Sequence, residues 1–168
     1  METLEFKKIL FKTAFCVMAC DGHIDELEIE EMKKIDTSTS YFNDIDLSSE
    51  LTRLISSVKS RGKIIVKELF QTLRENELST VQELLIVEVA LRIINADNKV
   101  DENEIKFLNF LRSKLDVANE TLIDRFGSIP SLVNMNYDKL KPMDLQEQFI
   151  KSMLFPETTI LKEIDLKN

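Results

Sequence analysis

The sequence is poor in glycine, proline and cysteine, and each shortage excludes a class of structure. Only 3 Gly and 3 Pro occur among 168 residues, far fewer than the tight turns of a many-stranded sandwich or barrel require. The two cysteines, Cys16 and Cys20, are too few for the disulfide framework of a small secreted domain. We therefore expect a mainly helical protein in a reducing, cytoplasmic compartment.

Basic residues and long apolar runs are also scarce. The chain has 22 Lys and Arg against 30 Asp and Glu, a net charge of −8, which repels a phosphate backbone; nucleic acid is not an expected partner, although a local basic patch is compatible with this charge. No apolar run reaches the roughly 18 residues of a spanning helix. Lys12 also interrupts the apolar stretch after Lys7 and Lys8. We expect neither a transmembrane segment nor an export signal.

The positive signal is an internal repeat. Hydrophobic residues make up 43% of the chain and charged residues 31%, the composition of one globular domain. A shift of 76 positions aligns residues 12–32 with residues 88–108. Six of the 21 aligned positions are identical, where composition alone predicts about one. The identical pairs are Ala14/Ala90, Asp21/Asp97, Asp25/Asp101, Glu26/Glu102, Glu28/Glu104 and Ile29/Ile105.

This repeat predicts an all-α fold, a compact multi-helix domain with an internally duplicated helix pair about a pseudo-twofold axis. The domain is expected over residues 1–126. Residues 127–168 form a partly helical C-terminal extension, since all three prolines fall there and one apolar pattern lies around residues 145–154. Residues 84–96 are apolar on nearly all sides and are expected to form the central buried helix.

The turn inside each copy has a clear local structure. Gly22 in the first copy and Asn98 in the second are suited to the left-handed conformation that ends a helix. Asp25 is a good N-cap, and Glu28 three residues later completes a capping box. The second copy places Asp and Glu at the same spacing. Each acidic pair therefore has a structural use.

The same turns crowd three carboxylates each, which is the donor type that hard divalent cations prefer. The candidate metal ligands are Asp21, Asp25, Glu28, Asp97, Asp101 and Glu104. Ca²⁺ is the favoured cation, because it accepts flexible oxygen geometry, and Mg²⁺ is the second candidate. The spacing is not that of an EF-hand loop. The alternative is that these residues are helix caps and solvated turn residues without a metal.

At these residues the sequence resembles a known family. ACDGHIDELE at residues 19–28 and NADNKVDENE at residues 95–104 look like the two copies of the signature in the tellurite-resistance TerB-like family, which is related to the N-terminal domain of DjlA-type membrane cochaperones. The resemblance covers residues 1–126. Cys20 and Asn98 stand where Ala and Gly are more usual in the family.

The resemblance implies an all-helical, pseudo-symmetric fold and a divalent metal held by the six acidic positions named above. It also implies protein partners in a bacterial stress-response or defence assembly at or near the inner membrane, and it implies no catalysis. The expected function is a cytoplasmic, divalent-cation-binding helical module that recruits or regulates such partners and meets the membrane through them. The alternative function is a metal-free helical adaptor.

Two other candidates for chemistry are weaker. Cys16, Cys20 and His23 have a spacing compatible with a soft-metal or thiol-redox site, whereas the structural alternative places both cysteines in the core. Glu88 lies four residues before Arg92 and is expected to form an ion pair with it. No phosphate loop, nucleophile elbow or His-Glu-x-x-His helix is present in the sequence. We do not expect an enzyme.

Overall fold

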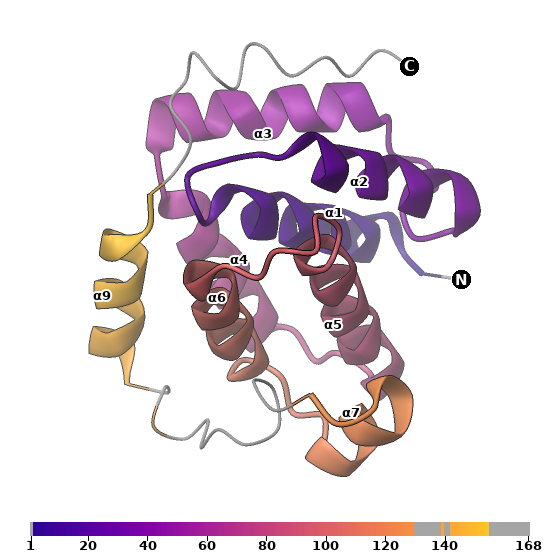
Figure 1. Ribbon diagram of the computed structural model, residues 1–168, viewed down its shortest axis with the longest axis vertical. Helices are drawn as coiled ribbons and strands as arrows, with labels where there is room; N and C mark the ends of the chain where they lie inside the picture. Colours follow the sequence, from indigo (N-terminus) through magenta and orange to yellow (C-terminus); the bar gives the residue numbers. More distant parts are fainter. Residues whose placement is uncertain (1, 130–138, 140–141, 155–168) are drawn as a thin grey trace.

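The computed structural model describes residues 2–129, 139 and 142–154, and in these parts of the chain the regular structure is entirely helical (Figure 1). The all-α prediction is confirmed. The helices are α1 (Leu4–Ala19), α2 (Glu26–Ser38), α3 (Leu47–Arg61), α4 (Ile64–Glu75), α5 (Thr80–Ile94), α6 (Glu102–Arg112), α7 (Asn119–Phe126) and α9 (Met143–Ser152).

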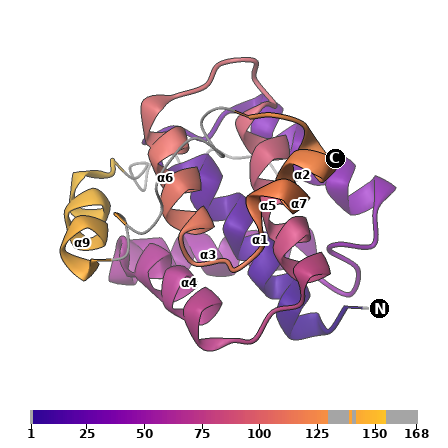
Figure 2. The same cartoon turned by 90° about the horizontal axis from the view of Figure 1, so that it is seen from below.

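The central helix is α1. In Figure 2 it runs through the middle of the molecule, with α3, α4, α5 and α6 around it. Between Leu10 and Cys20 every residue except Lys12 is buried. The sequence pattern assigned this place to residues 84–96, whereas Leu84, Leu85 and Leu91 of α5 are only partly buried. The reason is that α5 packs most extensively on α1 and leaves an outer face to the solvent.

The helix starts follow from their capping residues. Ser79 Oγ accepts a hydrogen bond from the backbone N–H of Gln82, and Gln82 Oε1 accepts one from the backbone N–H of Ser79. Asp46 caps α3 by accepting from Ser49 N at 2.7 Å. Aspartate is among the best N-cap residues, so Asp46 sets the start of α3.

The C-terminal helix α9 packs against the rest of the molecule. Its Phe149 ring stacks on Phe110 of α6, with ring centroids 4.8 Å apart. Met153, directly after α9, is fully buried in the same core cluster. The helix expected around residues 145–154 is therefore present at residues 143–152. The remaining parts of the predicted extension, residues 130–138, 140–141 and 155–168, lie outside the described residues.

The two segments that carry the sequence repeat, α1–α2 and α5–α6, share several contacts. α1 packs on α5, α2 packs on α5, and α6 packs on α1. The pseudo-twofold axis that the repeat predicts stays a prediction. No described helix is long and apolar enough to cross a membrane.

Candidate functional site

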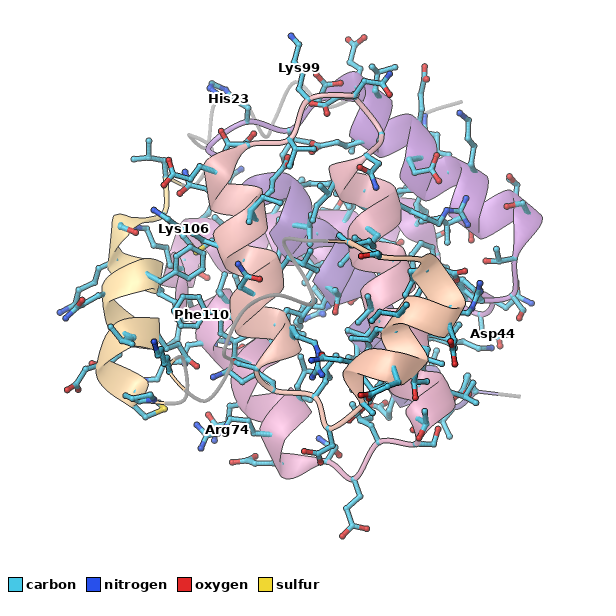
Figure 3. The ribbon with its side chains drawn as sticks, turned by 60° about the horizontal axis from the view of Figure 1, so that its bottom comes forward. His23, Asp44, Arg74, Lys99, Lys106 and Phe110 are labelled. Atoms are coloured by element: carbon cyan, nitrogen blue, oxygen red, sulfur yellow. The ribbon has the colours of Figure 1, made fainter. Side chains whose placement is uncertain are left out.

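The two acidic turns join α1 to α2 and α5 to α6. Figure 3 labels one residue of each turn, His23 and Lys99, and both lie at the same end of the molecule. The α1–α2 turn carries Asp21 and Asp25, and the α5–α6 turn carries Asp97 and Asp101.

Backbone N–H groups hold the first aspartate of each turn. Asp21 Oδ1 accepts from His23 N at 2.8 Å, and Asp97 Oδ1 accepts from Lys99 N at 2.9 Å. The residue between them has a positive φ in both turns, +86° at Gly22 and +58° at Asn98. Glycine and asparagine are the residues that adopt this conformation most easily, so the expected turn conformation is confirmed.

The second aspartate of each turn begins the next helix. Asp25 Oδ1 accepts from Leu27 N at 2.7 Å, and Glu28 Oε2 accepts from Asp25 N at 3.0 Å. In the second turn Asp101 Oδ1 accepts from Asn103 N at 2.7 Å, and Glu104 Oε2 accepts from Asp101 N at 3.3 Å. Both predicted capping boxes are therefore present.

The two capping-box glutamates are the most deeply placed carboxylates of the site. Glu28 is 2% exposed and Glu104 is 1% exposed. The pKa of Glu28 is raised to about 8, mainly by burial and also by the charges of Glu104, Asp21 and Asp97, while the backbone hydrogen bond from Asp25 opposes the rise.

Glu104, in the second turn, is likewise a buried carboxylate with a raised pKa. Burial raises its pKa to about 7, and Asp21, Asp97 and Asp101 contribute in the same direction. The pKa of Asp21 is raised by burial and by Asp101. Each glutamate thus lies within electrostatic range of carboxylates from both turns. The turns form one acidic cluster rather than two independent ones.

The cluster as it stands directs its oxygens to the backbone. Among the described residues no three His, Cys, Asp or Glu side chains are arranged to hold a metal ion. Each of the six predicted ligands accepts a hydrogen bond from a backbone N–H group. A cation at this site would therefore require some of the carboxylates to rotate toward it.

The cysteines are core residues. Cys16 and Cys20 are buried, free thiols, and Cys20 Sγ donates to Val17 O at 3.1 Å. Burial raises the pKa of Cys16 to about 12 and that of Cys20 well above its ordinary value. His23 is exposed in the turn. The two cysteines therefore lie in the core, as the structural alternative predicted.

The expected Glu88–Arg92 pair is wrong. Arg92 Nε donates to Glu31 of α2 at 2.7 Å, and Glu88 accepts from Arg125 of α7 at 2.8 Å. An i,i+4 pair on a helix is worth only about 0.2–0.5 kcal/mol, so partners from neighbouring helices displace it easily. The order of residues along α5 gives no signal for either of these long-range pairs.

Sequence reasoning also missed a buried acid outside the turns. Glu83 on α5 is 5% exposed, and its two oxygens accept from Asp116 N at 2.9 Å and Val117 N at 2.6 Å. Arg112 supports the same loop by donating to the carbonyls of Leu115 and Val117. Only the position of Glu83 on an apolar helix hints at a buried role.

Fold and site together define an all-helical protein with two acidic turns gathered at one end. Comparison of the chain with protein-family models, with curated proteins and with solved structures gives no match.

Proposed function

We propose that the protein is a divalent-cation-binding helical module that recruits or regulates protein partners, the function that its resemblance to TerB-like sequences implies. The observation that carries the proposal is the electrostatic interaction between the carboxylates of the two turns. Glu28 and Glu104 are buried carboxylates that come from different helices, and burial raises the pKa of both. The charge of Glu104 also raises the pKa of Glu28, and the charges of Asp21 and Asp97 raise the pKa of both glutamates. Such a cluster is stabilised by whatever neutralises it, either protons or a cation.

A bound Ca²⁺ ion would draw oxygen ligands from Asp21, Asp25 and Glu28 and from their counterparts Asp97, Asp101 and Glu104. Ca²⁺ suits the site better than Mg²⁺, because it accepts six to eight oxygens in flexible geometry and carbonyls of a turn can complete its shell. Mg²⁺ demands near-ideal octahedral geometry. The carboxylates already lie at one end, so the rearrangement needed is local.

Cation occupancy would act on the packing between the helix pairs. The buried glutamates sit in the first turns of α2 and α6, and α2 packs on α5 while α6 packs on α1. Two large apolar side chains, Leu27 and Val100, are exposed beside the turns, at 46% and 54%. A change in the turns would reposition these side chains, which are suited to contact a protein partner.

The proposed setting is a bacterial stress-response system, with the protein in the cytoplasm and near the inner membrane only through its partners. This setting rests on the sequence resemblance alone. The acidic cluster supports the cation-binding part of the proposal. A pull-down with and without Ca²⁺ would identify the protein partner.

Calorimetric titration of Ca²⁺ and then Mg²⁺ into chelator-stripped protein tests the proposal. The variant Asp21→Asn/Asp97→Asn removes two charges but keeps the Asx-turn acceptors, since the asparagine side-chain oxygen can still accept from residues 23 and 99. The matched control Glu26→Gln/Glu102→Gln removes two charges from exposed neighbours in the same turns. We expect micromolar or tighter binding that is lost in the first variant and kept in the control.

The second candidate function is a metal-free helical adaptor. The observation that favours it is that backbone N–H groups already satisfy the turn carboxylates without an ion. Absence of heat and of any change in melting temperature with either ion would exclude the cation-binding proposal and leave the adaptor.

A further inference from the structure

A polar hollow away from the acidic turns lies between α1, α3 and α4. Its volume is about 550 Å³, within the range of roughly 300–1,000 Å³ typical of small-molecule sites. Its lining includes Lys8 and Lys12 of α1 and Arg53 of α3. None of its lining residues belongs to either acidic turn.

Lys12 is the most unusual of these residues. It is the one partly exposed position in an otherwise buried stretch of α1, and no carboxylate of the described residues lies within 4.0 Å of its ammonium group. Burial lowers its pKa, and the positive charges of Arg53 and Arg61 lower it as well, while Cys16 and Glu50 oppose them. An ammonium group in such a place is stabilised by an anion.

The neighbours of Lys12 increase the local positive charge. Lys8 lies one helical turn before it, an i,i+4 spacing at which like charges destabilise a helix. The nearest carboxylate to Lys8 is Glu5, exposed and 3.9 Å away. Arg53 is held by Glu50 through Nε at 3.1 Å and Nη2 at 2.6 Å. This grip fixes the guanidinium group and leaves its Nη1 hydrogens available for a ligand.

We propose that this hollow binds a small organic phosphate. Lys8, Lys12 and Arg53 line it together with one acidic residue, Glu5, and Glu50 beside it pairs with Arg53. The two lysine ammonium groups are therefore the charges that meet a phosphate monoester, which carries about −1.5 to −2. Lysines bind phosphate as point charges, and an arginine adds directional N–H donors. Ile9, which is partly buried, also lines the hollow and offers an apolar contact to the organic part of the ligand.

The phosphate could belong to a soluble ester or to the headgroup of a membrane phospholipid, since the chemistry of recognition is the same. A soluble ester would bind in the hollow as a whole molecule. A lipid headgroup would enter from its open side while the acyl chains stay in the bilayer. Binding tests with a soluble phosphate ester and with lipid vesicles distinguish these two sources.

Titration of the ¹⁵N-labelled full chain with glycerol 3-phosphate, at constant ionic strength, tests the site. We expect saturable shifts of the amide signals of Lys8, Lys12, Thr72 and Asn76, which line the hollow. The variant Lys8→Gln/Lys12→Gln should bind at least tenfold more weakly. The control Lys33→Gln/Lys34→Gln removes two lysines of α2 that do not line the hollow and should bind as the wild type does.

Flotation with phosphatidylcholine vesicles containing phosphatidic acid, compared with phosphatidylcholine alone, forms the lipid arm. Binding in either arm that is lost in Lys8→Gln/Lys12→Gln and kept in the control supports the site and identifies its source. No saturable binding in either arm overturns the proposal, as does equal weakening in both variants. If the variant does not fold, the wild-type shifts decide: shifts spread over lysines outside the hollow overturn it too.

Discussion

Gly22 in the first acidic turn lies against the backbone of Leu154, which follows α9. A Cβ atom on Gly22 would lie 3.0 Å from the carbonyl oxygen of Leu154 and 3.1 Å from its Cβ. Gly22 also has a φ of +86°. Leu154 therefore packs on the turn that carries Asp21 and Asp25. Only a residue without a side chain allows this close approach.

The change Gly22→Ala should lower the free energy of unfolding by about 1–3 kcal/mol, because it adds left-handed strain to a steric contact. It should also shift the methyl signal of Met153, which is buried next to Leu154. Urea denaturation and methyl NMR measure the two effects. Gly127→Ala is the control: its φ is +80°, but a Cβ there meets nothing within 4 Å. An unmoved Met153 signal in Gly22→Ala would contradict the contact.

The buried glutamates predict how stability depends on pH. The pKa of Glu28 is about 8 and that of Glu104 about 7 in the folded protein, both above the ordinary value of 4.5. The folded state therefore binds these protons more tightly than the unfolded state, and their stabilising effect is complete below about pH 4.5. The free energy of unfolding should lose this contribution as the pH rises through about 7–8.

Glu28→Gln should flatten this loss, because glutamine keeps a side-chain acceptor for Asp25 N and does not ionise. The measurement is urea denaturation of both proteins, in chelator, between pH 5 and 9. Glu26→Gln, an exposed neighbour, serves as the control and should follow the wild type. An identical pH dependence in wild type and Glu28→Gln would show that Glu28 does not titrate in this range.

Local chemistry made part of this structure predictable from sequence. Asp25 with Glu28, and Gly22 at the turn, are neighbours along the chain, so their spacing alone predicts the capping box and the left-handed residue. The gathering of both turns into one acidic cluster depends on the packing of α1 on α5. The repeat predicts two equivalent turns. The spacing of residues along the chain does not give the distance in space between them.

Interactions between distant helices were the unpredictable part. The Arg92 side chain pairs with Glu31 of α2 and not with Glu88 of its own helix. The hollow lined by Lys12 and Arg53 forms where α1 meets α3. The net charge of −8 does not predict this basic hollow, because a net charge does not describe how charges are distributed over a surface. Such features require the tertiary arrangement.

Glu83 is predicted to be a structural acid. It bridges α5 to the loop at Asp116 and Val117 by accepting two backbone N–H groups. Glu83→Gln turns one acceptor into a donor that faces an N–H group, and it should lower the free energy of unfolding by about 1–3 kcal/mol. Glu77→Gln, exposed in the loop before α5, should leave stability within about 0.5 kcal/mol of the wild type. Urea denaturation compares them, and equal stabilities would refute the bridge.

The thiols supply the last prediction. Thiolate is the reactive form of cysteine, and burial raises the pKa of Cys16 to about 12 and that of Cys20 well above its ordinary value. Neither thiol should react with a thiol-specific disulfide reagent in the folded protein at pH 8, whereas both should react after unfolding in urea. A variant Ser113→Cys, with a partly buried but accessible side chain at the end of α6, confirms that the reagent works on the folded protein. Rapid native labelling of Cys16 or Cys20 would contradict their burial and revive a redox role, because a structural core thiol reacts only when the helix around it opens.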